Sequence, residues 1–158
     1  MPTPDAVPEP WDSFFRELDA ELSEDVRLCC AGGFAVTIQC GLPRQTSDVD
    51  VLSFVPVAQI QTVLVTLPEN HEERTTESFP ARYKRLRLFG LDPYDLALSK
   101  LERNSQIDRD DIKYLFRTVP LDLDVLEHRY RSEQRPCLSN EAKHDLTLGL
   151  WLDMLKET

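Results

Sequence analysis

Residues 26–54 read VRLCCAGGFAVTIQCGLPRQTSDVDVLSF, and this stretch decides the fold. Its first apolar residues alternate, as Val26, Leu28 and Cys30 do, which is typical of a strand with one buried face. Two glycines follow, and then an apolar run long enough for one or two helical turns. Gly41 suits a left-handed cap at the end of that helix. The pattern predicts a strand, a turn, a short helix over 34–40, a loop and a second strand.

Two features of this stretch carry chemistry. Gly32 and Gly33 let the backbone turn sharply and approach a ligand closely, and the N–H groups at a helix N-terminus attract anions. Asp48 and Asp50 alternate at the head of the second strand, so their carboxylates point the same way. Two such charges are costly side by side unless a cation lies between them, and a divalent metal is the usual one. The sequence therefore predicts a phosphate-binding loop beside a metal site, as nucleotide phosphoryl chemistry requires.

These residues resemble the nucleotidyltransferase superfamily of the DNA polymerase beta type, whose signature is Gly-Gly or Gly-Ser, a short helix and then Asp-x-Asp. A second block is similar to small bacterial members, including the abortive-infection nucleotidyltransferase toxins and an uncharacterised domain grouped with them. In those proteins Asp-Leu-x-x-x-Lys-Leu is followed by Arg-Asp-x-x-Asp. The matching segments here are DLALSKL at 95–101 and DRDDI at 108–112. Together the two blocks cover residues 11–117.

The resemblance implies roles for individual residues. Asp48 and Asp50 would hold Mg²⁺ or Mn²⁺, and Asp108 would assist as a third acid or base. The residues that would contact the nucleotide and its phosphates are Gly32, Gly33, Arg44, Thr46 and Lys100. Most active members of the superfamily carry a third carboxylate on a later strand, but the stretch expected to form that strand here, 82–89, contains no acid. Either Asp108 takes that place or the site is weakened.

Each of these residues also has a purely structural interpretation. The glycines can form an ordinary tight turn, and Asp48 and Asp50 a solvated strand edge. Arg44 and Lys100 can be surface charges, the latter with its stem packed on a helix. Asp108 and Asp111 can cap a helix N-terminus. The basic stretch 82–89 favours either an RNA or triphosphate contact or an exposed strand whose charges discourage edge pairing.

Composition narrows the function classes. The 158 residues carry a formal net charge of −10, which argues against a protein that coats nucleic acid by bulk electrostatics. A local basic groove for RNA or a nucleotide remains open. The four cysteines include no Cys-x-x-Cys pair, so reduced thiols are expected. Neither a signal peptide nor a run of about 20 apolar residues is visible. We expect a cytoplasmic protein without a membrane span.

The expected fold class is α/β (α+β): a small mixed β-sheet nucleotidyltransferase core flanked by helices, with a helical C-terminal half. Residues 1–10 would form a flexible proline-rich tail, 11–117 the core, and 118–158 C-terminal helices packed on that core in one domain overall. Apolar periodicity predicts helices at 11–22, 57–67, 110–117, 121–131 and from 139–141 onward. A further helix would carry Lys100, and 69–80 would form a loop.

The expected function is a Mg²⁺-dependent nucleotidyltransferase that moves a nucleoside monophosphate from an NTP to a hydroxyl of RNA, such as a tRNA, or of a protein. By resemblance it would belong to a toxin–antitoxin pair or a phage-defence system, with a cognate antitoxin or toxin protein as partner. One alternative is a catalytically inactive relative that serves as an antitoxin or nucleotide sensor. A third interpretation is a helical interaction module in which both motifs are coincidental.

Overall fold

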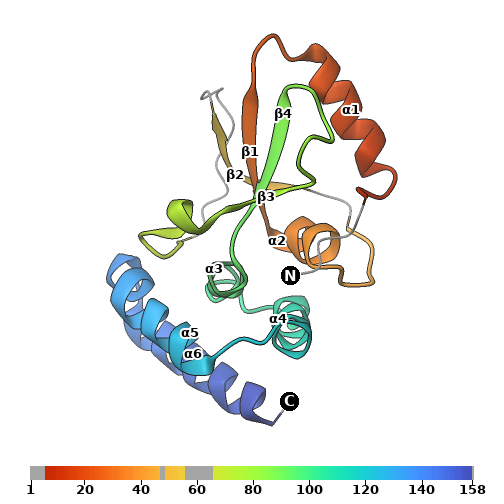
Figure 1. Ribbon diagram of the computed structural model, residues 1–158. Helices are drawn as coiled ribbons and strands as arrows, with labels where there is room; N and C mark the ends of the chain where they lie inside the picture. Colours follow the sequence, from red (N-terminus) through yellow and green to blue (C-terminus); the bar gives the residue numbers. More distant parts are fainter. Residues whose placement is uncertain (1–5, 47–48, 56–65, 158) are drawn as a thin grey trace. The chain divides into compact units, whose positions relative to one another are not determined.

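The computed structural model describes residues 6–46, 49–55 and 66–157, with the backbone alone at 53–55. The chain forms two compact units, Met1–Val63 with Thr75–Leu91 and Leu64–Arg74 with Asp92–Thr158. The strands belong to the first unit, and helices α3 to α6 belong to the second (Figure 1). The expected division into a tail, a core and C-terminal helices of one domain stays a prediction.

A mixed sheet forms the centre of the first unit, and its order within the described residues is β2-β1-β4-β3. Strand β1 (Val26–Ala31) is antiparallel to β2 (Asp50–Val55) and parallel to β4 (Leu86–Gly90). Strand β3 (Thr76–Ser78) is antiparallel to β4. Together with the helices, this sheet confirms the predicted α+β class with a helical C-terminal half.

The stretch that follows β1 turns into a helix as its glycines predict. Helix α2 (Gly32–Phe34) continues without a break into a π-helical turn, η1 (Ala35–Gln39). Gly41 then has a φ of +76°, the left-handed conformation expected after this helix. Because Gly32 has a φ of +63°, the chain reverses from strand to helix within one residue, which most side chains would resist.

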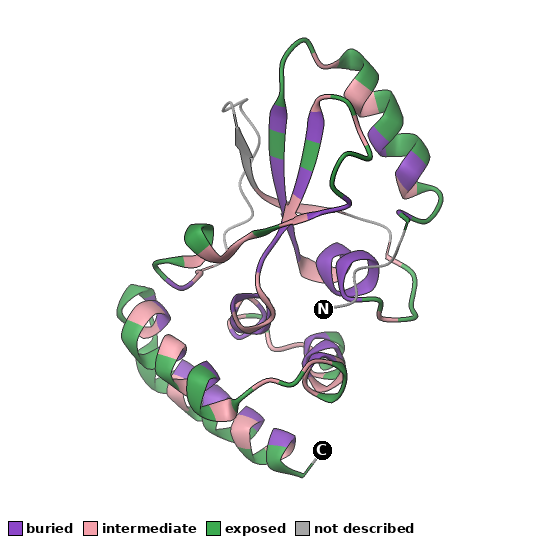
Figure 2. Ribbon diagram, in the orientation of Figure 1, coloured by how far each residue is buried: buried purple, intermediate pink, exposed green. Residues whose placement is uncertain are grey.

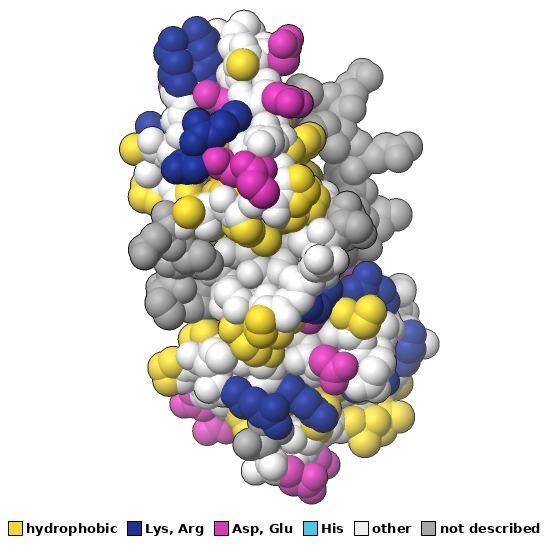
Figure 3. Space-filling view, turned by 90° about the vertical axis from the view of Figure 1, so that its right-hand side faces the viewer, with side chains coloured by type: hydrophobic (Ala, Val, Ile, Leu, Met, Phe, Trp, Pro, Cys, Tyr) yellow, Lys and Arg dark blue, Asp and Glu magenta, His cyan; other side chains and the backbone are white. Residues whose placement is uncertain are grey.

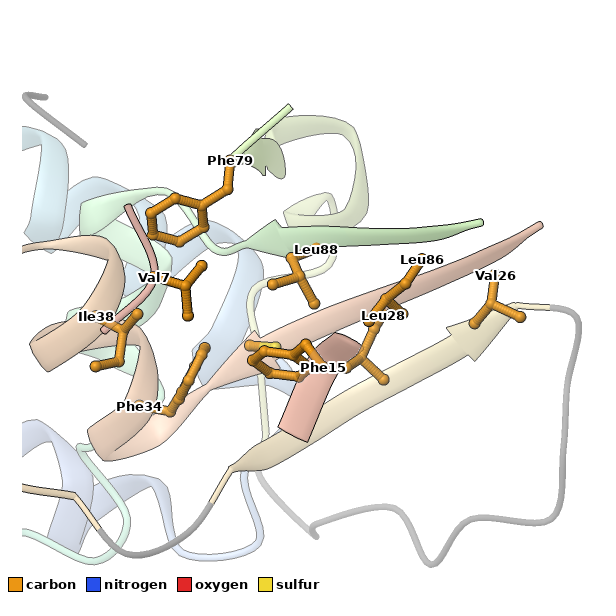
Figure 4. Packing of buried hydrophobic residues seen from close by; sticks show 10 residues of the cluster. Val7, Phe15, Val26, Leu28, Phe34, Ile38, Phe79, Leu86 and Leu88 are labelled. Atoms are coloured by element: carbon orange, nitrogen blue, oxygen red, sulfur yellow. The ribbon is translucent and has the colours of Figure 1, made fainter. Parts of the chain in front are cut away.

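The core of the first unit lies between one face of the sheet and the helices (Figure 4). Phe15 of α1 (Trp11–Glu21) and Phe34 of α2 meet edge to face, with ring centroids 5.6 Å apart. The alternating residues of β1 and β4 face them, as the period-two pattern predicts. Full burial of each such side chain stabilises the fold by roughly 1.5–3 kcal/mol. Val7, within the expected tail, is also buried in this core.

The expected strand at 82–89 begins only at Leu86, because the residues before it form hydrogen bonds with carboxylates of α1. Asp19 accepts backbone hydrogen bonds from Lys84, Arg85 and Leu86 at 2.7–3.0 Å. Arg82 donates to Asp12 at 2.6 Å. Arg82, Lys84 and Arg85, which were expected on a strand, therefore hold the loop before β4 against α1.

Two more expectations change. Residues 69–80 are not a plain loop, since they contain a 3-10 turn, η2 (His71–Arg74), and strand β3. The helix predicted over 57–67 falls mostly on residues outside the described ranges.

The second unit is helical, and its helix starts follow the local sequence. Asp92, Ser105, Asp122 and Asn140 each accept a backbone N–H at an N-cap, as short polar side chains do. The helical segments are α3 (Pro93–Leu98), α4 (Gln106–Thr118), α5 (Leu123–Arg129), η3 (Tyr130–Gln134), η4 (Arg135–Cys137) and α6 (Glu141–Lys156). The periodicity therefore located α4, α5 and α6, although α4 starts earlier than expected. Trp151 and Tyr130 are the largest side chains buried in this unit.

Gly32→Ala tests the strand-to-helix reversal. A Cβ at this position would collide with the carboxylate of Asp50, lying 2.6 Å from its Cγ and 3.0 Å from its Cβ. Together with the positive φ, this should lower the free energy of unfolding by about 3 kcal/mol. Gly149→Ala is the matched control, because its Cβ would meet nothing within 4 Å and alanine favours a helix by about 0.5–1 kcal/mol. Urea unfolding in dilute solution should move the two variants in opposite directions. If Gly32→Ala and Gly149→Ala have equal free energies of unfolding, the strand-to-helix reversal does not require a glycine at position 32.

Candidate functional site

Three chain segments meet at one edge of the sheet. Ala31, the last residue of β1, pairs with Asp50, the first residue of β2. On the other side of β1, Cys30 pairs with Gly90 at the end of β4. Since α2 begins directly after β1 (Figure 1), the Gly-Gly turn and the head of β2 come together at this edge.

A β-bulge sets the direction of the Asp50 side chain. Cys29 pairs with Ser53 and Cys30 with Val51, so Leu52 is an extra residue in β2. Because side chains alternate along a strand, one extra residue turns every position beyond it to the other face. Without the bulge, Asp50 would not lie opposite Ala31. Bulges of this kind commonly aim a side chain beside a functional site.

Gly32 and Asp50 are in direct contact. The space that a side chain at Gly32 would fill is taken by the carboxylate of Asp50. Asp50 is half-buried there. Burial, and to a smaller extent the neighbouring Cys29 and Asp50, raise the pKa of the Cys30 thiol. Asp50 and Gly32, 18 positions apart in sequence, thus form one local structure.

Gly33, Arg44 and Thr46 form the other half of this structure. A Cβ added at Gly33 would lie 3.2 Å from Thr46 Oγ1 and 3.3 Å from a guanidinium nitrogen of Arg44. The bare backbone of the turn thus faces a hydroxyl and a cation, which are both donors to phosphate oxygens. Ala31 at the N-cap of α2 gives no side-chain cap. We call Gly32, Gly33, Arg44, Thr46 and Asp50 the cradle.

The donor chemistry of the cradle fits a magnesium ion. Mg²⁺ prefers hard oxygen ligands and is commonly held by one or two carboxylates together with substrate phosphates and water. Asp50 supplies one such carboxylate, while Asp48 lies outside the described residues. Among the residues that are described, no three His, Cys, Asp or Glu side chains gather as a metal site. The predicted metal site of Asp48 and Asp50 stays a prediction.

The second predicted block lies in the other unit and forms a buried ionic cluster. Lys100 is not on a helix, because α3 ends at Leu98 and Lys100 follows in a turn. Its ammonium group contacts Asp111 at 2.9 Å and Asp108 at 3.7 Å, and all three side chains are at most 2% exposed. The cluster fastens the turn after α3 to the start of α4.

Asp108 is engaged on every side. Arg103 donates to it at 2.8 and 2.5 Å, and the backbone N–H and hydroxyl of Ser105 donate to it at 2.8 and 2.7 Å. Although burial opposes ionisation, these hydrogen bonds lower the pKa of Asp108 to about 2. The carboxylate and Ser105 form a capping box at the N-terminus of α4. The catalytic role of Asp108 stays a prediction, and its contacts favour a structural one.

A second ionic cluster was missed by sequence reasoning. Asp95, which is fully buried, accepts from Arg74 at 2.8 and 3.1 Å and from Arg129 at 3.1 Å. Arg74 also donates to Glu133 at 2.8 Å. Burial raises the pKa of Asp95 in spite of these cations. The sequence analysis included Asp95 as the first residue of the segment 95–101, but no pattern in the sequence indicates that it pairs with Arg74.

Gln39 is a further residue that the sequence did not single out. It is 4% exposed at the end of η1, and its side-chain Nε2 has no hydrogen-bond partner within the part of the chain that the structure describes. Its amide group occupies the space beside the Cα of Gly90. A polar residue inside the apolar run 34–40 was the available signal.

Figure 3 shows the distribution of charged side chains on one face of the molecule. On the face that Figure 3 shows, basic side chains form several separate groups with acidic ones among them. Within the described residues, no helix has both the length and the apolar character needed to cross a bilayer.

Replacing Lys100 tests the structural interpretation of the second block. Lys100→Met keeps the stem but removes the charge from a cluster that contains two buried carboxylates. Breaking a buried ionic contact typically costs 3–5 kcal/mol, so the free energy of unfolding should fall by about 3 kcal/mol. Lys84→Met at an exposed position should change it by less than about 0.5 kcal/mol. A stable Lys100→Met protein would instead indicate that the lysine is held for a ligand.

A scan against known protein families matches residues 12–156 to a family described as a nucleotidyltransferase of unknown function (DUF6036). Searches of curated proteins and of solved structures gave no match. The family match spans both units and contains every residue of the cradle and of both ionic clusters. The chain therefore belongs to this nucleotidyltransferase family.

Proposed function

We propose that the protein is a Mg²⁺-dependent nucleotidyltransferase whose nucleotide site is the cradle. The observation that carries this proposal is the contact between the bare backbone at Gly32 and the Asp50 carboxylate. It joins a turn suited to phosphate with an acid suited to a divalent cation. Membership of a nucleotidyltransferase family supports the reaction class.

Each residue of the cradle has a defined task in this proposal. Gly33 has no side chain of its own, so the backbone of the turn can come close to a triphosphate that Arg44 and Thr46 contact. Arg44 and Thr46, which lie beside Gly33, donate to phosphate oxygens and orient the chain of phosphates. Asp50 holds the metal together with Asp48. When bound, the metal would neutralise phosphate charge and stabilise the negative charge on the attacking and leaving oxygens.

The reaction is an in-line displacement at phosphorus. An acceptor hydroxyl attacks the α-phosphorus of an NTP, a new P–O bond forms, and the bond to the β-phosphate oxygen breaks. Pyrophosphate leaves with that electron pair, and the hydroxyl proton passes to water. Catalysis of this kind depends mainly on positioning and on neutralising charge, so a small cradle with few functional groups suffices.

The acceptor and the biological role extend the proposal. The acceptor would be a hydroxyl of an RNA, such as a tRNA, or of a protein side chain. The resemblance to small bacterial toxins supports a place in a toxin–antitoxin pair or a phage-defence system, with a cognate protein as partner. The scattered charge on the face in Figure 3 favours recognition of an acceptor by local contacts over broad electrostatic attraction.

A second candidate is a nucleotide-binding relative without transferase activity. Strand β4, beside β1, carries no carboxylate and ends at Gly90 against Gln39. Asp108, the other candidate for a third acid, is occupied by Arg103 and Ser105. Such a protein would bind NTP and metal through the same cradle and serve as an antitoxin or a nucleotide sensor.

Label transfer from each α-³²P NTP, with Mg²⁺ or Mn²⁺, tests the proposal on total RNA and on protein acceptors. We expect Asp50→Asn to lower transfer by about 100-fold or more, since it removes roughly 3 kcal/mol of transition-state stabilisation. The matched control is Asp25→Asn, an exposed aspartate ahead of β1, which should leave transfer unchanged.

The outcomes separate the two candidates. Transfer that disappears in Asp50→Asn but persists in Asp25→Asn supports the enzyme and identifies its nucleotide. Metal-dependent NTP binding with no transfer in any reaction supports the inactive relative. Absence of both binding and transfer would contradict the cradle as a nucleotide site.

A further inference from the structure

Helix α6 presents apolar side chains on two opposite sides. One side packs into the core of the second unit through Leu148, Trp151 and Leu155. The opposite side carries Leu146 and Leu150, which are 67% and 61% exposed. A surface helix normally has a single apolar side, so two exposed leucines one turn apart indicate a contact surface.

Six of the exposed residues of α6 make a continuous strip. At about 100° per residue, they fall within roughly a third of the helix circumference. Figure 2 shows the same separation of exposed and buried residues along the C-terminal helices. We call this strip the outer face of α6, and it consists of Ala142, Lys143, Leu146, Gly149, Leu150 and Asp153, all exposed.

Gly149 leaves one margin of the outer face unusually open. A Cβ added there would meet nothing within 4 Å, and an exposed glycine inside a helix costs about 0.5–1 kcal/mol relative to alanine. In the folded unit alone this glycine has no packing role. It would let the backbone of another helix approach closely beside Leu146.

The outer face is complementary to itself. Lys143 and Asp153 lie five residues before and after Leu148, and Leu146 and Leu150 lie two residues before and after it. If a second α6 runs antiparallel across this midpoint, Lys143 of each copy meets Asp153 of the other. Each Leu146 then meets Leu150. Charge and apolar residues therefore match at the same register, which selects a second copy of the chain as the partner.

The present contacts of these charges do not oppose such pairing. Asp153 lies 3.5 Å from Lys156, and both side chains are largely exposed, at 76% and 63%. Exposed pairs of this kind contribute about 0–1 kcal/mol and exchange partners easily. Lys143 is exposed in the first turn of α6, where the helix dipole disfavours a cation unless an anion is near it.

We propose that the chain forms a two-fold symmetric homodimer by antiparallel packing of the outer faces of α6. The interface is isologous, since the same residues contribute from both copies. One helix on each side buries less than the roughly 1,200 Å² of a standard stable complex, so the dimer is weak and depends on concentration. None of these residues belongs to the cradle, and the dimer is independent of the proposed reaction.

Charge reversal tests the register, with sedimentation equilibrium as the measurement. Lys143→Glu alone and Asp153→Lys alone each place like charges opposite each other twice, and each should weaken the dimer about tenfold or more. An equimolar mixture of the two variants restores both opposite-charge contacts, because each copy then supplies what the other lacks. The mixture should therefore dimerise about as well as the wild type. Leu146→Asp, at an exposed position, should abolish dimers, and melting curves confirm that all variants are folded.

The result expected is a wild-type dimer that each single reversal weakens and the mixture restores. Three results would overturn the proposal. They are a wild type that stays monomeric up to its solubility limit, a dimer that is indifferent to Leu146→Asp, and single reversals that the mixture does not rescue.

Discussion

The contact between the Gly32 backbone and the Asp50 carboxylate is the constraint on which the first unit depends. It exists only because position 32 has no side chain and a positive φ, so the chain reverses at the end of β1 while β2 starts beside it. The bulge at Leu52 then gives Asp50 its direction. The absence of a side chain at position 32 thus sets the turn, the start of α2 and the position of the Asp50 carboxylate. Fold and proposed function use the same few atoms.

The second unit is organised on a different principle. Its two ionic clusters, around Lys100 and around Asp95, bury charge within a helical assembly. Burying charge is costly unless every group has a partner, and here Arg103, Arg74 and the helix caps supply them. Such clusters add little net stability compared with apolar packing, but they penalise alternative arrangements, because any shift leaves a buried charge without its partner. A family motif can therefore mark a structural cluster as well as a catalytic group.

The sequence predicted what local patterns encode. Period-two alternation located β1, and apolar periodicity located α1, α5 and α6. The glycine turn followed from residue type, whereas its contact with Asp50 depends on the pairing of β1 with β2. What failed depended on partners distant in sequence: Asp19 of α1 removes residues 84 and 85 from the expected strand, and the bulge in β2 follows from pairing with β1. Likewise, the burial of Lys100 reflects its contacts with α4, which no pattern around position 100 contains.

The central claim is that Asp50 and the glycine turn form one site for a metal-bound nucleotide. Electron paramagnetic resonance of free Mn²⁺, titrated with protein in the presence of a non-hydrolysable NTP analogue, tests it directly without requiring an acceptor. The account predicts that the wild type removes Mn²⁺ from solution far more strongly with the analogue than without it. Asp50→Asn should abolish that difference, while Asp25→Asn should keep it. Mn²⁺ binding that is the same in the wild type and in Asp50→Asn would contradict the claim.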